Sequence, residues 1–291
     1  MKKACFIIVN FGKAPPWKNL FMHSCAKNSD YDWIIYTDKP NSWHKGDFNV
    51  PSNIWIKKIE IKQFEEKFKS TTGFNLRISQ NLRKICDAKP FYGIVFAEDV
   101  LNYKYIGNCD HDIIWGDIKK FLGSTIDEEY DIISSRLNIL SGHCTLYKNK
   151  TEVFEYCLNS GPFRPLSGNI KDKEYLTLKE IIEDEIHHSF DEPIYSTKLR
   201  TKKAKESLSI YWPQDLSNYT PDYINLIMQS NDKRKGIMRK ECSWTYQDGK
   251  TFLDNYGEIL YIHFMNWKNI IKDPDFSLNN FKLNKNGIIK C

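Results

Sequence analysis

Residues 103–112 read Tyr-Lys-Tyr-Ile-Gly-Asn-Cys-Asp-His-Asp, a largely apolar stretch that runs into two acidic residues. The stretch is typical of a β-strand, and Asp110 and Asp112 follow where that strand should end. Two carboxylates separated by one residue point to the same side of an extended segment. If the chain turns there, both can reach one divalent cation, and Mg²⁺ or Mn²⁺ prefers such ligands. A polar strand end without a ligand is the alternative.

Strand and helix patterns alternate along the first half of the chain. Further strands are predicted from apolar runs at 4–9, 32–38, 54–61 and 131–135, and helices from amphipathic patterns at 18–27, 62–69 and 75–89. Such alternation is typical of the α/β class, in which helices cover both faces of a parallel or mixed sheet. Beyond residue 200 the pattern is irregular and rich in aromatic residues.

The length and composition indicate one large folded domain, or one domain with a C-terminal extension. The chain has 291 residues, of which 41% are hydrophobic and 14% aromatic, enough to fill a core. The net charge of +5 is too weak to indicate nucleic-acid binding by itself. No apolar run reaches the ~18 residues of a membrane span. The apolar run at 4–9 lacks a cleavage pattern after it, so we expect a cytoplasmic protein.

A second candidate element lies near the end of the chain. His263 stands in an apolar, strand-like stretch, and Lys268 follows five residues later. A histidine in such a stretch is most often a core residue, and Lys268 could be an ordinary surface lysine. Beside the Asp-x-Asp segment, however, a neutral imidazole could supply a third metal ligand, and Lys268 could meet a diphosphate oxygen. A metal and a lysine together neutralise the charge that develops on a leaving diphosphate.

Three segments resemble bacterial nucleotide-sugar glycosyltransferases of the GT-A fold, from capsule and lipopolysaccharide loci. The resemblance rests on residues 7–17, 84–90 and 105–117 and covers the first half of the chain. His263 and Lys268 resemble the late H-x(4)-K element of the retaining glycogenin and galactosyltransferase-like branch. The resemblance implies an α/β, GT-A-like (Rossmann-like) mixed sheet with helices on both faces and an irregular, aromatic-rich C-terminal part. It also implies Mn²⁺ or Mg²⁺, held by Asp110, Asp112 and His263.

The same resemblance implies a single GT-A-like catalytic domain over residues 1–291. Residues 1–150 would form the nucleotide-sugar-binding half. Residues 151–291 would form the acceptor half and carry the C-terminal metal and diphosphate element. The donor would be bound by side chains from several segments: Asn10, Phe11, Gly12, Tyr36, Thr37, Asp38, Lys84, Asp87, Asp110, His111, Ser141, Gly142, His143 and Lys268.

Each of these segments has an expected role. Residues 10–12 and 36–38 would hold the base and ribose. Lys84 and Asp87 lie one helical turn apart and share a face. They would meet the donor diphosphate and sugar, or else form a surface ion pair. Residues 141–143 would lie under the transferred sugar, or else form a simple turn.

A carboxylate could act as the catalytic base that deprotonates an acceptor hydroxyl. Asp191 or Glu192 is the candidate, with the end of a solvated acidic helix as the alternative. The late H-x(4)-K element favours retaining chemistry.

Two other functions remain open. One is a metal-dependent nucleotidyltransferase, although the chain lacks a glycine-rich phosphate loop. The other is a non-catalytic carbohydrate-binding module that would use its many aromatic residues.

The expected partners follow from this reading. The donor would be a nucleotide sugar, and we expect a UDP-sugar; the acceptor would be a glycan or lipid-linked glycan. A lipid-linked acceptor would bring the protein to the inner membrane face. Two late basic clusters and two tryptophans would suit that contact, or the clusters would form a solvated face: Lys198, Arg200, Lys202, Lys203, Lys205, Lys233, Arg234, Lys235, Arg239, Lys240, Trp212 and Trp244.

Overall fold

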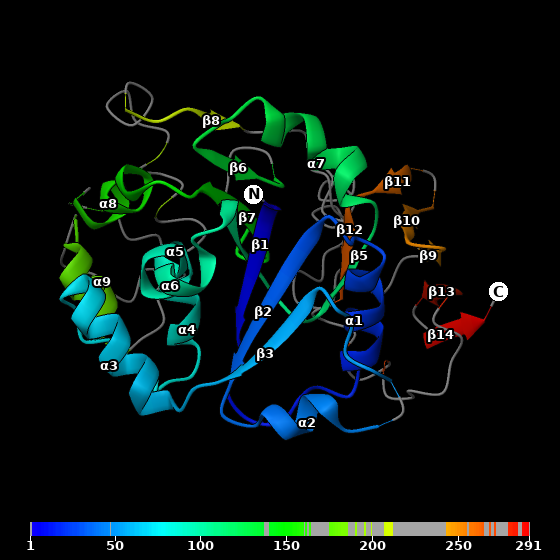
Figure 1. Ribbon diagram of the computed structural model, residues 1–291, viewed down its shortest axis with the longest axis horizontal. Coiled ribbons are helices and arrows are strands. Elements are labelled where there is room, and N and C mark those ends of the chain that lie inside the picture. The colour runs from blue at the N-terminus through cyan, green and yellow to red at the C-terminus, as the bar shows by residue number, and fades with distance from the viewer. Residues whose placement is uncertain are drawn as a thin grey trace, which may run out of the picture.

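A seven-stranded mixed sheet forms the centre of the protein in the computed structural model (Figure 1). In spatial order its strands are β3 (Ile54–Lys58), β2 (Tyr31–Thr37), β1 (Lys2–Val9), β4 (Tyr103–Cys109), β7 (Cys144–Lys148), β6 (Ile132–Ser134) and β8 (Ile210–Tyr211). The first four are parallel, and β7 is antiparallel to both of its neighbours.

The structure describes most of the first half of the chain and parts of the second. The described residues are 2–46, 48–136, 140–159, 161, 163, 175–185, 190, 195, 199, 207–211, 243–254, 256–264, 268, 271, 279–284 and 287–290.

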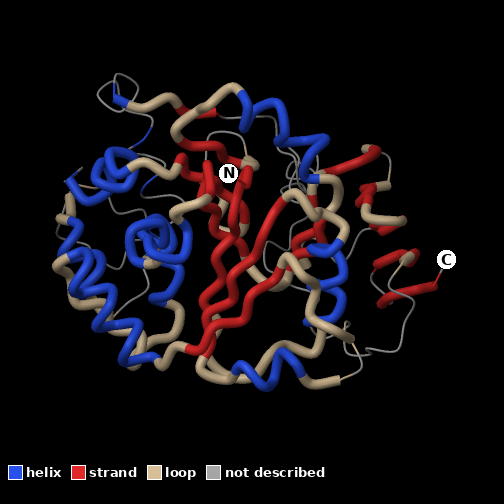
Figure 2. The backbone as a smooth tube through the Cα atoms, viewed as in Figure 1, coloured by secondary structure: helices blue, strands red, loops and turns tan. Residues whose placement is uncertain are grey.

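Helices cover both faces of the central sheet (Figures 1 and 2). They are α1 (Lys18–Ala26), α2 (Pro40–His44), α3 (Ile61–Thr72), α4 (Lys84–Asp87), the 3₁₀ helix η1 (Lys89–Phe91), α5 (Tyr92–Val95), α6 (Ala97–Val100), α7 (Ile118–Asp127), α8 (Thr151–Asn159) and α9 (Leu178–Glu183). Elements α3 to α6, α8 and α9 lie on one face, and α1 and α7 lie on the other. The predicted α/β class is therefore confirmed. No helix in the described ranges is long and apolar enough to cross a bilayer.

The apolar sequence of β1 explains this two-sided cover. Successive side chains of a strand point to opposite faces of the sheet. Cys5 and Ile7 pack in the cluster under α3 to α6, whereas Phe6 and Ile8 pack in the cluster under α1 and α7. All four are buried, and this is why the strand is apolar at every position from Ala4 to Val9 rather than at alternate ones.

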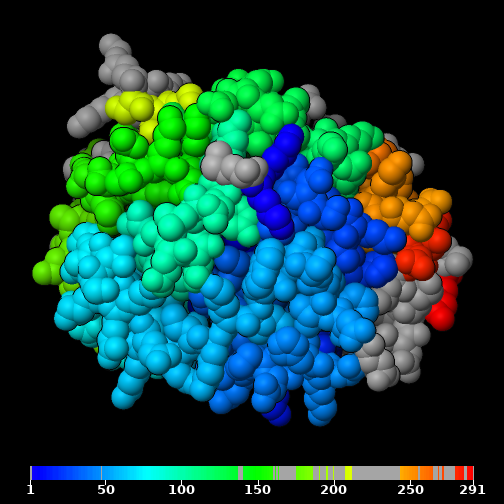
Figure 3. Space-filling view, in the orientation of Figure 1, coloured from blue at the N-terminus to red at the C-terminus, as the bar shows by residue number. Residues whose placement is uncertain are grey.

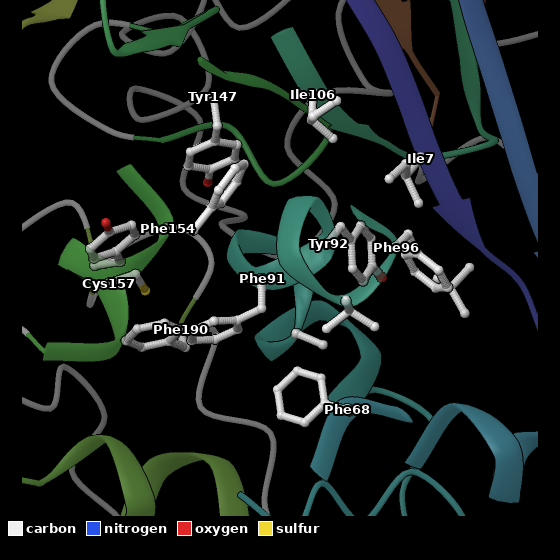
Figure 4. Packing of buried hydrophobic residues seen from close by; sticks show 14 of the residues in the cluster. Ile7, Phe68, Phe91, Tyr92, Phe96, Ile106, Tyr147, Phe154, Cys157 and Phe190 are labelled. Atoms are coloured by element: carbon white, nitrogen blue, oxygen red, sulfur yellow. The ribbon is translucent and has the colours of Figure 1, made fainter. Parts of the chain in front are cut away.

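The larger cluster combines aliphatic side chains with stacked aromatic rings (Figure 4). Tyr36 of β2 stacks on Phe96, with ring centroids 3.8 Å apart. Phe91 stacks on Phe190 at 6.0 Å, so the short helices after α4 are fixed against a distant part of the chain. Burying one such ring contributes about 1.5–3 kcal/mol to the free energy of folding.

The order of the parallel strands reverses at β1. Strands β2 and β3 extend the sheet on one side of β1, and β4 lies on its other side. Ligands of open α/β sheets bind outside the carboxyl ends of the strands at such a switch point. Here β1 ends at Val9 and β4 at Cys109, so Asn10 and Asp110 follow directly at that place.

A second, antiparallel sheet stands where the sequence predicted an irregular C-terminal part. Its strands, in spatial order, are β11 (Gly257–Ile259), β10 (Lys250–Leu253), β9 (Trp244–Gln247), β13 (Asn280–Asn284) and β14 (Gly287–Lys290). In the space-filling view these orange to red residues lie at one side of the molecule (Figure 3). Trp244, expected at a membrane surface, is buried in the core of this sheet with Tyr246 and Phe281, so that expectation is wrong.

A short ladder connects this C-terminal part to the end of β4. Strand β12 (Tyr261–His263) pairs antiparallel with β5 (Ile113–Trp115), which places His263 opposite Ile113. The ladder brings the late histidine to the Asp-x-Asp segment.

The helix predicted over residues 75–89 is mostly absent. Residues 75–83 form a loop, and only α4 and η1 are helical. Backbone N–H groups of this loop donate to side chains rather than to backbone carbonyls of a helix. Glu65 accepts from the Ser79 N–H at 2.8 Å, and Glu183 accepts from the Asn75 N–H at 3.1 Å. Such side-chain contacts compete with the helix for backbone groups.

Candidate functional site

A cavity of about 280 Å³ lies at the carboxyl ends of β1 and β4. Apolar side chains from β1 and from residues 82–92 line part of it. Its charged lining residues, among those that the structure describes, are Lys89, Asp110, Asp112 and Lys268. Both acidic residues of the Asp-x-Asp segment therefore face the cavity that the strand order predicts.

Asp110 lies at the open side of the cavity, with 32% of its side chain exposed. Lys89 is nearly buried below it, and its Nζ donates to Asp110 Oδ1 at 2.9 Å. The same Nζ donates to the carbonyl oxygen of Gly142 at 2.7 Å. Lys89 thus connects the end of β4 to the turn that precedes β7.

Asp112 is buried and has two basic neighbours. Lys268 Nζ lies 2.7 Å from Asp112 Oδ2, and His263 Nε2 lies 3.4 Å from Oδ1. The Phe264 N–H donates to the backbone carbonyl of Asp112 at 3.0 Å, which holds the two segments together. Burial alone would raise the pKa of the Asp112 carboxyl, but the adjacent His263 and Lys268 outweigh burial and hold that pKa well below its usual range.

His143 completes a group of metal-ligand atoms. Its ring centroid is 4.2 Å from that of His263. One ligand atom each from Asp110, His143 and His263 lie within 4.8 Å of one another. Burial lowers the pKa of His143 well below that of free imidazole, and the charges of His263 and Arg136 lower it further. A neutral imidazole is the form that binds metals. Imidazole nitrogens are ligands of divalent transition metals, whereas Mg²⁺ and Ca²⁺ prefer oxygen ligands. This set of one carboxylate and two imidazoles therefore suits a divalent transition metal better than Mg²⁺ or Ca²⁺.

The loop after β1 forms another edge of the cavity. Asn10 and Phe11 line it, and the buried Asn10 Nδ2 has no hydrogen-bond partner among the described residues. Gly12 has a φ of 95°, which favours glycine, and its N–H donates to Asp38 Oδ1 at 2.6 Å. Asp38 therefore holds the loop in place rather than lining the cavity.

Tyr36 and Thr37 do not line the cavity either. Both are buried, and the Tyr36 hydroxyl donates to the Asp99 carboxylate. Thr37 Oγ1 accepts from the Lys39 N–H at 3.1 Å. The structure gives these two side chains packing and hydrogen-bonding roles outside the cavity lining, while the Tyr36 carbonyl accepts from the N–H of the lining residue Asn10 at 2.9 Å.

Lys84 and Asp87 form a fully buried ion pair, with Lys84 Nζ 2.9 Å from Asp87 Oδ2. Lys84 Nζ also donates to the Ile181 carbonyl at 2.7 Å, and Asp87 Oδ1 accepts from the Phe190 N–H at 2.8 Å. Neither lines the cavity, and neither is on the surface. The buried position of Lys84 and Asp87 therefore agrees neither with the predicted contact to the donor nor with the alternative of a surface ion pair.

The turn at residues 141–143 lies beside the charged side chains. Besides Lys89, Asn108 Nδ2 donates to the Gly142 carbonyl, at 2.8 Å. The Ser141 hydroxyl lies 3.3 Å from that of Tyr261 in β12. The turn is therefore fixed on two sides, which sets the position of His143.

His111 lies between the two acids and lines the cavity. Its backbone carbonyl accepts from Trp17 Nε1 at 3.1 Å, so the start of α1 supports the Asp-x-Asp segment. The Trp17 ring also lies 5.6 Å from Lys268 Nζ. Burial lowers the pKa of His111.

The model of a family of unknown function, DUF6625, matches residues 6–291. The chain belongs to this family. No curated protein matches the sequence. Among solved structures, mouse xyloside xylosyltransferase 1 in its apo form is similar, with a TM-score of 0.45 and 6% sequence identity; the match covers 90% of this chain and 96% of that chain.

The candidate base of this DUF6625 protein lies outside the described residues. Asp191 and Glu192 both fall there, as do the two basic clusters and Trp212 that were expected at a membrane.

The sequence does not single out Lys89 or Trp17 as site residues. It predicts that His143 lies under the transferred sugar rather than in a metal group. Lys89 lies in the segment 84–90, but helical spacing in that segment points to Lys84 and Asp87 instead. No spacing rule connects His143 with His263, because their contact depends on how β7 and β12 pack.

Proposed function

We propose that this protein is a metal-dependent glycosyltransferase of GT-A type. It would transfer a hexose from a nucleotide-diphosphate sugar to a surface polysaccharide or lipopolysaccharide acceptor. We propose a UDP-sugar as the donor. One observation carries the proposal: Asp110 and Asp112 share a cavity at the switch point of the sheet with Lys268, and His263 lies against Asp112. This set combines metal ligands with a cation that can reach a diphosphate.

Asp110, Asp112 and His263 would hold Mn²⁺ or Mg²⁺, with His143 as a further ligand. The two imidazoles favour Mn²⁺. When bound, the ion would neutralise charge on the leaving diphosphate as a Lewis acid. Lys268 would donate to a diphosphate oxygen, and the Nδ2 of Asn10 would donate to the nucleoside. We assign the acceptor base to Asp191 or Glu192.

A thermal-shift panel tests the proposal. UDP-, GDP-, CMP- and dTDP-sugars are each added with and without Mn²⁺, to the wild type and to Asp112→Asn. A donor at 100 times its Kd should stabilise the wild type by about 2.7 kcal/mol. The shift should require Mn²⁺ and disappear in Asp112→Asn, which keeps the shape of the side chain. Stabilisation that persists in EDTA, or none with any donor, contradicts the proposal.

The stereochemical course is a separate part of the proposal. His263 and Lys268 both contact Asp112, as the H-x(4)-K element of the retaining branch would require. We therefore expect retention. Proton NMR of the first product assigns its anomeric configuration, and inversion would overturn this part alone.

A further inference from the structure

Two free cysteines lie opposite each other where β4 ends and β7 begins. Cys109 is the last residue of β4, Cys144 is the first residue of β7, and the antiparallel register pairs them directly. Both are buried and carry free thiols. Both side chains pack in the cluster under α1 and α7, so they lie on the same face of the sheet.

The backbone bonds of Cys144 show which kind of pair this is. Its carbonyl accepts from the Ser135 N–H at 3.3 Å, and its N–H donates to the Ser141 carbonyl at 3.0 Å. Both groups point away from β4, so Cys109 and Cys144 form a pair without mutual hydrogen bonds. The Cα atoms of such a pair lie about 4.5 Å apart. Disulfides bridge Cα separations of roughly 4.4–6.8 Å, so the two thiols are close enough to be joined.

Cys109 is also the member of the pair that a small solute can approach. It lines the cavity at the carboxyl ends of β1 and β4, and Cys144 does not. Burial raises the pKa of both thiols, which slows their reactions. The reduced pair should therefore persist until an oxidant enters the cavity.

We infer that Cys109 and Cys144 form a reversible cross-strand disulfide that acts as a redox switch on the candidate metal group. The oxidant would be hydrogen peroxide, which is small enough for the cavity. Peroxide transfers one oxygen to the sulfur of Cys109, which gives a sulfenic acid and one water. The thiol of Cys144 then attacks that sulfur; the S–S bond forms, the S–O bond breaks, and a second water leaves.

The disulfide would act on the metal group through the two adjacent residues. Asp110 follows Cys109, and His143 precedes Cys144; both belong to the group of ligand atoms that includes His263. Widening the pair from about 4.5 Å to the commonest disulfide separation, roughly 5.5–6 Å, would move the strand ends apart by about 1 Å. Metal-ligand distances tolerate only about 0.2 Å. Oxidation should therefore weaken metal binding, and this consequence rests on the proposed function, whereas formation of the disulfide does not.

Peptide mapping after oxidation tests the disulfide. The reduced protein is treated with hydrogen peroxide, catalase removes the excess, and mass spectrometry identifies linked peptides. We expect a peptide pair that joins Cys109 to Cys144 and that dithiothreitol separates. Cys25→Ala is the matched control, because Cys25 is a buried thiol of the same cluster but lies on α1, and this variant should still form the disulfide.

Mn²⁺ binding in the presence of UDP, measured by electron paramagnetic resonance, tests the consequence. Oxidation should weaken Mn²⁺ binding by the wild type at least about tenfold, and dithiothreitol should restore it. Cys144→Ala cannot form the bond and should bind Mn²⁺ as the reduced wild type does, before and after peroxide. Both proteins keep Cys86, another thiol that lines the cavity, so its oxidation would affect them alike. Circular dichroism checks that each variant is folded.

Several results would overturn the inference. One is that peroxide yields no peptide pair of Cys109 and Cys144, or joins Cys109 to Cys25 instead. Another is that the disulfide forms but leaves Mn²⁺ affinity unchanged, which removes the switch and leaves the proposed function standing. If the reduced wild type binds no Mn²⁺ with UDP, the proposed function fails and the switch fails with it, even where the disulfide forms.

Discussion

The rings of His143 and His263 lie 4.2 Å apart, although one comes from the turn before β7 and the other from β12 near the end of the chain. The contact brings both imidazoles to Asp110. It connects the central sheet to the C-terminal part beside Asp110, which lines the cavity, although neither histidine lines it.

The first prediction concerns His143 as a metal ligand. His143→Gln should weaken Mn²⁺ binding in the presence of UDP at least about tenfold, because one of the clustered donor atoms is lost. Titration calorimetry measures the change. His44→Gln, at an exposed position of α2, is the matched control and should bind as the wild type. Equal affinity in both variants would show that His143 only packs against His263.

The second prediction concerns the buried pair of Lys84 and Asp87. Lys84→Met should lower the free energy of unfolding by about 3–5 kcal/mol, because it leaves Asp87 charged and buried without its cation. The double variant Lys84→Met/Asp87→Leu should recover part of that loss. Urea unfolding measures both. Mn²⁺ affinity should stay unchanged in the single variant, and a selective loss of metal or nucleotide binding without loss of stability would restore the donor-binding role.

The third prediction concerns Gly116, which follows β5. A Cβ there would lie 2.5 Å from Thr251 Oγ1 and 2.9 Å from the Ile259 carbonyl. Gly116→Ala should therefore destabilise the protein by about 1–3 kcal/mol. It should also weaken Mn²⁺ binding, because the contact sets the position of β12 and His263.

Gly123→Ala is the control for Gly116→Ala. Gly123 lies inside α7, and a Cβ there would meet only Lys119 Cγ at an ordinary 3.5 Å. This substitution should raise stability by about 0.5–1 kcal/mol. Thermal unfolding shows whether each substitution raises or lowers the stability. Equal effects of both substitutions would refute the close-packing argument.

The fourth prediction concerns pH and Asp99. Burial opposes ionisation of this carboxyl, but hydrogen bonds from Lys57 and Tyr36 outweigh burial and lower its pKa. A lowered folded-state pKa contributes stability above the unfolded value and loses it as the pH falls through the folded value. Asp99→Asn should therefore be less stable than the wild type at neutral pH, and the difference should shrink below about pH 4. Urea unfolding at several pH values checks this, and a gap that grows on acidification is the opposite result.

The sequence predicts much of the central sheet because its signals are local. β1, β2 and β4 appear as apolar runs, and the Asp-x-Asp segment marks the end of β4. The predicted arrangement of Asp110, Asp112, His263 and Lys268 around one place agrees with their positions, although their chemical roles stay proposals.

What the sequence does not predict depends on packing between distant segments. Lys84 and Lys89 both contact a carboxylate and a backbone carbonyl. Only Lys89 lines the cavity, because η1 turns it toward the end of β4 while Lys84 faces α9. Helical spacing alone cannot distinguish them. The C-terminal sheet also escapes prediction from the sequence, because its strands are short and because β9 pairs with β13, which lies far along the chain.

The most direct test of the account is anomalous diffraction at the manganese edge from crystals grown with Mn²⁺ and UDP. The account predicts one strong peak within coordinating distance of Asp110, Asp112, His263 and the diphosphate oxygens. A manganese peak away from these side chains, or a diphosphate bound outside the cavity between β1 and β4, would contradict it.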